Sequence, residues 1–214
     1  IDKTSSNIVI LGAGSIGQSF AAAFADAGWT VTLVDPDHTI RNNVQVGLEI
    51  KSDAIQWAGL SQAGGRSVRV LAKAGATLST AAIVLECGPE DLNAKQEIFR
   101  GLLAKTPPET ILATASSAIV MSEILPDPID QSRCLVAHPV NPPAILRVIE
   151  QVPAPGTLWK TTTRSTSIFS AAGFTVVTLG HEVEGFVMNR LQSAVLRESY
   201  RLVDEGVTDV EGVD

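Results

Sequence analysis

His138 is the side chain whose type and position in the sequence best suit proton transfer. It ends the apolar run RCLVAH and precedes the segment PVNPP at 139–143. The run predicts a buried strand, and ligands of open α/β sheets bind at the carboxyl ends of strands. A histidine there can take the hydroxyl proton of an alcohol as hydride leaves it, near neutral pH. We predict His38 to be a surface residue, and His181 falls in a domain junction without special neighbours.

Three glycines near the start of the chain predict a dinucleotide site. They form the pattern G-x-G-x-x-G between the apolar run NIVIL and the helix-like stretch QSFAAAFADAG. The glycines permit a tight strand-to-helix turn, close approach of a pyrophosphate and close packing of the helix, whose positive end receives the phosphates. The candidate cofactor-binding residues of this turn are Gly12, Ala13, Gly14, Ser15, Ile16 and Gly17.

Asp35 indicates which dinucleotide binds. It ends the next strand-like run, TVTLV, 23 positions after Gly12. An acid at about this spacing binds the ribose hydroxyls, and its charge would repel the 2′-phosphate of NADP. No arginine immediately follows Asp35, so the sequence favours NAD. We predict no metal site.

The elements that must position these residues alternate along the chain. Strand-like runs occupy residues 7–11, 30–34, 68–71, 82–86, 110–113, 133–137, 146–152 and 174–179, and helix-compatible stretches separate several of them. This alternation predicts an α/β fold, a Rossmann-type doubly wound and mostly parallel sheet.

The character of the chain changes beyond Gly180. Residues 185–205 form a long helical stretch with a stripe of apolar side chains, and nine residues follow it. Such a stripe needs a surface to pack on. We therefore expect an NAD-binding domain at 1–183 and, at 184–214, the truncated beginning of a helical C-terminal domain, or else a helix that packs on a partner chain.

The composition of the chain limits the kinds of partner that it can bind. The net charge of −7 argues against nucleic acid or an anionic membrane as the main partner. No apolar run reaches the roughly 20 residues that span a bilayer, and residues 1–7 lack the layout of a signal peptide. Cys87 and Cys134 lie in apolar strand-like runs, as free buried thiols do. We expect a cytoplasmic protein.

Three segments carry a family resemblance. LECGPEDL, AHPVNPP and GFVMNRLQSAVLRESYRLVDEG resemble the 3-hydroxyacyl-CoA dehydrogenase family, and within it the λ-crystallin and L-gulonate 3-dehydrogenase branch. The resemblance covers almost the whole chain. It implies a homodimer formed through the helical C-terminal domain.

The resemblance also assigns roles to residues. The family's base matches His138, and the glutamate twelve residues on, which fixes and supports the imidazole, matches Glu150. The substrate-holding serine and asparagine match Ser117 and Asn189. Towards the nicotinamide half of NAD, the resemblance carries Glu90, Lys95 and Asn141. Without it, Glu90 would read as an acid at a helix N-terminus and Lys95 as a solvated lysine.

Some features depart from the acyl-CoA enzymes of the family. Between Asp35 and Glu86 the chain has only two lysines, Lys51 and Lys73, where those enzymes carry a longer, lysine-rich helical hairpin. HPVNPP replaces their more usual His-Phe-Phe-Asn-Pro, and Arg147 stands where branch members often have proline. The first two differences favour a small free L-3-hydroxy acid, gulonate-like or carnitine-like, as substrate.

Two alternatives stay open from the sequence. One is an L-3-hydroxyacyl-CoA dehydrogenase of fatty-acid oxidation, and the other is a non-catalytic NAD-binding protein like some crystallins. Dehydrogenases resembling the 6-phosphogluconate and 3-hydroxyisobutyrate enzymes use a lysine on the helix entering the second domain. They are set aside because no lysine follows Lys160.

Overall fold

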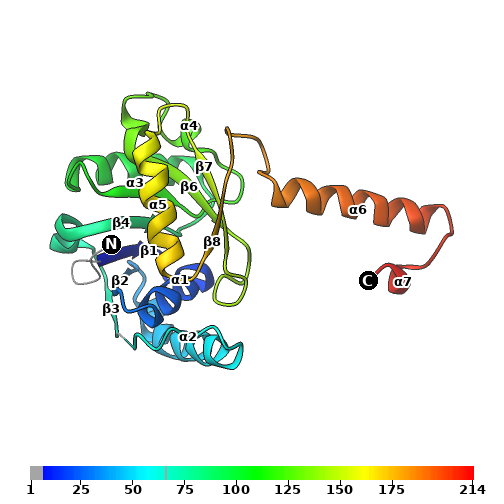
Figure 1. The fold of residues 1–214 in the computed structure, drawn as a ribbon, viewed down its shortest axis with the longest axis horizontal. Coiled ribbons are helices and arrows are strands. Elements are labelled where there is room, and N and C mark those ends of the chain that lie inside the picture. Colours follow the sequence, from blue (N-terminus) through cyan, green and yellow to red (C-terminus); the bar gives the residue numbers. More distant parts are fainter. Residues whose placement is uncertain (1–6, 66) are drawn as a thin grey trace.

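The computed structural model describes residues 7–65 and 67–214, so residues 1–6 of the segment compared with a signal peptide lie outside it. Within the described residues the chain forms an eight-stranded sheet in the order β3-β2-β1-β4-β5-β6-β7-β8 (Figure 1). Every neighbouring pair is parallel except β6 and β7, which are antiparallel. The predicted doubly wound, mostly parallel sheet is confirmed. Its strands are β1 Asn7–Leu11, β2 Thr30–Val34, β3 Val68–Leu71, β4 Ala81–Glu86, β5 Ile111–Thr114, β6 Cys134–Pro139, β7 Val148–Pro153 and β8 Thr175–Thr178.

Helices cover both faces of this sheet, as its apolar strands require. On one face, Phe20 and Phe24 of α1 pack with Phe169 of α5 and with apolar side chains of β1, β2 and β4. On the other face, Phe99 of α3 and Met121 of α4 close a second core. These helices and two others are α1 Ser15–Asp26, α2 His38–Trp57, α3 Leu92–Lys105, α4 Met121–Ile124, α5 Trp159–Ala171 and α7 Val210–Val213; short 3-10 turns span Gly75–Thr80 and Asp130–Arg133.

Helix α6, Met188–Asp204, differs from the others in its surroundings. It extends away from the sheet domain toward the C-terminus (Figure 1). None of its residues is buried, and Leu191, Val195 and Tyr200 are 59%, 67% and 62% exposed. The apolar stripe expected in 185–205 is therefore present and open to solvent.

One predicted element boundary shifts for a visible reason. Strand β7 begins at Val148, two residues later than the apolar pattern suggests, because Arg147 belongs to the preceding loop. The buried Arg147 guanidinium donates hydrogen bonds to the carbonyl oxygens of Ala144 and Ala172 and lies over the Phe174 ring. These contacts tie the β6–β7 loop to the end of α5.

Candidate active site

The glycine turn joins β1 to α1 at the centre of the sheet. A Cβ on Gly12 would lie 2.6 Å from the Cys87 carbonyl oxygen, and one on Gly17 would lie 1.9 Å from the Gly12 oxygen. Gly12 also has φ of +99°, a conformation that favours glycine. A Cβ on Gly14, by contrast, would meet nothing within 4 Å. The turn is therefore packed on its inner side and open where α1 begins.

The open side suits a phosphate group. Gly14 is the N-cap residue of α1, and no side chain caps the helix there. The first amides of an uncapped helix, together with its dipole, attract anions. The turn thus fits the pyrophosphate of a dinucleotide.

Asp35 lies just past β2, beside this turn. The carboxylate accepts a hydrogen bond from the Ala13 amide at 2.8 Å and another from the Asp37 amide at 2.9 Å. Ala13 is fully buried, so its amide fixes Asp35 and is not free for a ligand. Asp35 nevertheless faces the adjoining cavity, where a carboxylate can accept hydrogen bonds from ribose hydroxyls.

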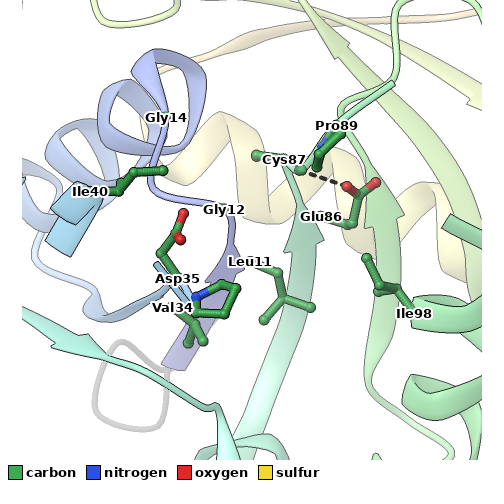
Figure 2. A pocket seen from close by; sticks show the side chains of 12 residues that line it. Leu11, Gly12, Gly14, Val34, Asp35, Ile40, Glu86, Cys87, Pro89 and Ile98 are labelled. Atoms are coloured by element: carbon green, nitrogen blue, oxygen red, sulfur yellow. Dashed lines mark hydrogen bonds between the residues drawn. The ribbon is translucent and has the colours of Figure 1, made fainter. Parts of the chain in front are cut away.

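A cavity of about 540 Å³ adjoins the turn and Asp35. Figure 2 shows Leu11 and Asp35 with Ile40 on one side of it and the Cys87–Pro89 turn after β4 on the other. Because its walls are mostly apolar, the cavity suits a flat aromatic base. Together with the turn and the acid, it fits the adenosine half of NAD.

His138 and Glu150 form a buried pair at the other half of the sheet. His138 Nδ1 lies 2.7 Å from Glu150 Oε2, and the two residues are 6% and 4% exposed. They are directly opposite each other in the antiparallel pairing of β6 with β7. A carboxylate can only accept, so the imidazole proton lies on Nδ1 and leaves Nε2 able to accept a proton.

The second oxygen of Glu150 holds the start of α6. Glu150 Oε1 accepts hydrogen bonds from the Val187 and Met188 amides, each at 2.9 Å. The ring of Phe186, fully buried, lies against the His138 imidazole with centroids 5.3 Å apart. The segment entering α6 thus contacts both members of the pair.

Ser117 lies in the loop after β5 and is held through its backbone. Its amide donates to Glu90 Oε1 at 3.0 Å, and its carbonyl oxygen accepts from Asn189 Nδ2 at 2.8 Å. Glu90 also accepts from the Ser116 hydroxyl at 2.5 Å. The structure therefore brings Ser117, Glu90 and Asn189 together and leaves Ser117 exposed to solvent.

Electrostatics keep Glu90 charged. Burial raises the pKa of Glu90, but the hydrogen bond from Ser116 and the charge of Lys95 outweigh this effect and hold that pKa below its ordinary value. Lys95 Nζ lies 3.4 Å from Glu90 Oε2. An ionised Glu90 is the state that accepts the loop amides.

The structure contradicts the interpretation of Lys95 as a solvated side chain. It is 1% exposed, and its ammonium group lies 2.8 Å from Glu86 Oε2. Glu86 is fully buried and also accepts from the Thr114 hydroxyl and the Gly88 amide (Figure 2 shows the Gly88 contact). Lys95 thus pairs with both Glu86 and Glu90 beneath the loops that follow β4 and β5.

The sequence prediction missed several residues. Glu86, Thr114, Ser116 and Phe186 carry the contacts described above, and none was singled out. Glu86 ends a predicted strand, so an acid at the carboxyl end of a buried strand was an available signal. Phe186 had no local signal, because its role depends on a contact with His138, 48 positions away.

The remaining residues singled out in the sequence differ in their exposure to solvent. Asn141 is exposed in the loop after β6, and Ser15 is exposed at the start of α1, with Ile16 partly buried next to it. Cys134 is buried, whereas Cys87 is partly buried just past β4; both are free thiols. Among the described residues, no three histidine, cysteine or acidic side chains are grouped as a metal site would need.

Comparison with known proteins identifies the family of this chain. A family model described as 3-hydroxyacyl-CoA dehydrogenase, NAD binding domain, matches residues 7–183. The λ-crystallin homolog of Homo sapiens is 33% identical over 97% of this chain and 67% of its own length. The L-carnitine dehydrogenase of Streptomyces coelicolor is 30% identical over 97% of this chain and 65% of its own.

A solved structure has a similar fold. It is a 5-formyl-3-hydroxy-2-methylpyridine 4-carboxylic acid 5-dehydrogenase, described as an NAD+-dependent dismutase. It aligns with a TM-score of 0.89 and 30% identity, over 97% of this chain and 68% of its own. The chain thus spans about two thirds of the length of these relatives.

The fold and site define an NAD-binding dehydrogenase domain. The chain belongs to the 3-hydroxyacyl-CoA dehydrogenase family, close to its λ-crystallin branch, and so to NAD-dependent oxidoreductases acting on CH–OH groups. NAD is its cofactor. In the part of the chain that the structure describes, no helix combines the length and apolar character needed to cross a membrane.

Proposed function

We propose that this protein oxidises the 3-hydroxyl group of a small L-3-hydroxy acid. The observation that carries the proposal is the buried His138–Glu150 pair, 2.7 Å apart at the carboxyl end of β6. A histidine in this state is a base, and a carboxylate on Nδ1 stabilises the imidazolium that forms when Nε2 takes a proton. The bound cofactor supplies the hydride acceptor.

The protein's own residues perform the remaining tasks. Glu150 orients the imidazole so that Nε2 meets the substrate hydroxyl, which loses its proton to His138 as hydride departs from C3. Ser117 offers a solvent-exposed side chain to the substrate from a loop fixed by Glu90, and Asn189 holds the same loop from α6. Lys95 and Asn141 support the nicotinamide end, Lys95 through Glu86 and Glu90.

Two observations support this substrate class. The region between Asp35 and Glu86 offers two lysines for the phosphates of CoA, and one similar protein is an L-carnitine dehydrogenase. A small free hydroxy acid, gulonate-like or carnitine-like, therefore suits the site better than a CoA thioester. We further propose that the whole protein is a cytoplasmic homodimer, with its second domain starting at residue 184.

Substitution of the base tests the mechanism. His138→Gln should keep NAD affinity while turnover falls by about 10²- to 10⁴-fold, because the proton acceptor is lost. His181→Gln provides a matched control, since His181 is exposed. Turnover by His138→Gln at the wild-type rate would remove His138 from the mechanism.

A substrate panel tests the substrate class. We expect NADH formation with L-gulonate or L-carnitine, and little reaction of acetoacetyl-CoA in the reverse direction. Preferential turnover of acetoacetyl-CoA would favour an acyl-CoA dehydrogenase. NAD binding without NADH formation from any of these compounds would favour a non-catalytic, crystallin-like protein.

A further inference from the structure

We infer that Phe186 is the positioning residue that holds the His138 imidazole in its reactive orientation; the inference rests on the proposed function. Phe186 lies between the sheet domain and α6, and the mechanism proposed above does not use it. Its ring contacts the imidazole, and the amides that follow it contact Glu150.

Packing sets Phe186 apart from its neighbours. It is fully buried, whereas Val187 is 45% exposed and α6 contains no buried residue. The planes of the phenyl and imidazole rings are inclined by 50° at a centroid distance of 5.3 Å, a tilted aromatic contact. The phenyl ring thus packs against the imidazole from the segment that enters α6, outside the β6–β7 pairing.

The backbone at Phe186 explains how one residue reaches both partners. Gly185 has φ of +72° and Phe186 has φ of +49°, so two consecutive residues adopt left-handed conformations. A non-glycine residue rarely adopts this conformation unless its surroundings hold it there. The turn directs the ring towards His138 and the next two amides towards Glu150 Oε1.

The chemical consequence concerns rotation of the imidazole. The Nδ1–H bond to Glu150 fixes one point of the ring, and the Phe186 contact fixes its plane. With both in place, Nε2 keeps one direction and one tautomer. Without the phenyl ring, the imidazole can swing about its side-chain torsions and water can compete for Glu150, so fewer encounters place Nε2 on the substrate hydroxyl.

Two substitutions distinguish the effect of the Phe186 ring from the effect of its backbone conformation. Phe186→Asn removes the ring but suits the left-handed conformation, since asparagine adopts it more readily than most residues. Phe186→Leu keeps an apolar side chain of similar bulk. Phe169→Leu is the matched control, because Phe169 is also fully buried but packs on Phe20, Phe24 and Phe174, away from His138.

Kinetics give the first measurement. With whichever of L-gulonate or L-carnitine the wild type oxidises, Phe186→Asn should lower kcat by about 10- to 100-fold, while KM and the NAD Kd stay within about twofold. Phe186→Leu should recover part of the loss. Phe169→Leu should lower the unfolding midpoint without changing kcat.

Nitrogen NMR gives a second measurement that needs no turnover. The chain has three histidines, so ¹⁵N-histidine labelling resolves their tautomers, and His138→Gln assigns the signal of interest. We expect a single Nδ1-protonated form for His138 in the wild type and in Phe169→Leu, and mixed or exchanging forms in Phe186→Asn.

The outcomes distinguish the two proposals. Phe186→Asn with the kcat and the His138 tautomer of the wild type would overturn the inference. If the wild type oxidises neither hydroxy acid, the proposed function fails, and the tautomer comparison alone decides the role of Phe186. If Phe186→Asn does not fold, the same comparison is made with Phe186→Leu, where a wild-type tautomer and kcat would count against the inference.

Discussion

Helices α1 and α6 both begin beside the candidate active site, but they are stabilised in opposite ways. Eight of the twelve residues of α1 are buried, whereas none of the seventeen residues of α6 is. Helix α1 begins at Gly14 without a side-chain cap, whereas the amides at the start of α6 are already bound by Glu150. Helix α1 belongs to the core, and its N-terminus lies where the phosphates of the cofactor are expected to bind. Helix α6 is held to the sheet domain mainly by its first residues.

The cofactor turn and the His138–Glu150 pair therefore rely on different parts of the molecule. The cofactor turn depends on close backbone packing within one continuous core. The His138–Glu150 pair depends in addition on a segment that leaves that core, through Phe186 and the Val187 and Met188 amides. Substitutions in the sheet domain should therefore alter stability, and substitutions along α6 beyond its start should alter it little.

The largest difference in stability is expected between variants of two ion pairs, one in the sheet domain and one in α6. Lys95–Glu86 is buried at 2.8 Å, and Arg201–Glu205 in α6 is exposed at 2.7 Å. Lys95→Met should destabilise the protein by about 3–5 kcal/mol, because it leaves Glu86 unpaired in the interior. Arg201→Gln should cost about 0.2–1 kcal/mol.

Urea unfolding followed by circular dichroism measures both variants. The double variant Lys95→Met/Glu86→Gln should recover part of the loss, since it removes the unpaired charge. Equal losses of stability for Lys95→Met and Arg201→Gln would contradict the proposed difference between the sheet domain and α6.

Substitutions in the glycine turn should have the next largest effect on stability, and they should also weaken NAD binding. Gly17→Ala should destabilise by about 1–3 kcal/mol and abolish NAD binding, because its Cβ would overlap the Gly12 oxygen. Gly14→Ala has room and should change stability by less than about 0.5 kcal/mol. It should still weaken NAD binding, since the added methyl stands where phosphates approach. Calorimetric titration with NAD measures this, and full affinity in Gly14→Ala would contradict the assigned phosphate position.

A smaller effect should depend on pH. Because the pKa of Glu90 lies below its ordinary value of 4.5, its contribution to stability is present above that value and is lost as the pH falls through the lowered pKa. Glu90→Gln should therefore lower the urea midpoint at pH 7, and the difference from wild type should shrink progressively as the pH falls below 4.5. Glu205→Gln, at the end of α6, serves as the control and should change the midpoint little. A Glu90→Gln difference that grew on acidification would have the wrong sign.

The smallest effect concerns thiol reactivity and involves no loss of stability. Burial raises the pKa of Cys134 to about 12, and burial followed by the charge of Glu86 raises the pKa of Cys87 well above its ordinary value. Neither thiol should react quickly with a disulfide reagent at pH 8 in the native protein. Ser193→Cys, on the exposed surface of α6, should add one fast-reacting thiol. Rapid labelling of Cys134 in the native state would show that the core around β6 is open.

The sequence predicted the fold because its signals are local. NIVIL, the glycine turn and TVTLV each define an element within a few residues, and the strand–helix–strand order restricts the topology. The antiparallel pairing of β6 with β7 accords with their short connection, because the eight residues 140–147 are too few for the crossover that a parallel pair needs. The contact of Arg147 with the Ala172 carbonyl oxygen, across 25 positions, could not be predicted from local patterns.

The candidate site was predictable where a residue type and a spacing coincide. Asp35 and His138 both end apolar runs, and family spacing connected His138 to Glu150; their 2.7 Å separation agrees with that prediction, while their catalytic roles stay predictions. The burial of Lys95 was missed because its helix pattern alone predicts an exposed side chain. Its partner Glu86 lies on a strand, and only tertiary packing brings the two together.

The cross-strand position of His138 and Glu150 has an evolutionary consequence. Since each side chain stands on a strand and the ladder fixes them opposite each other, the eight residues 140–147 that connect them do not set their separation. Insertions, deletions or exchanges in that connection can reshape the surroundings of the imidazole while the pair itself stays intact. The connection can thus diverge during evolution without loss of the His138–Glu150 hydrogen bond.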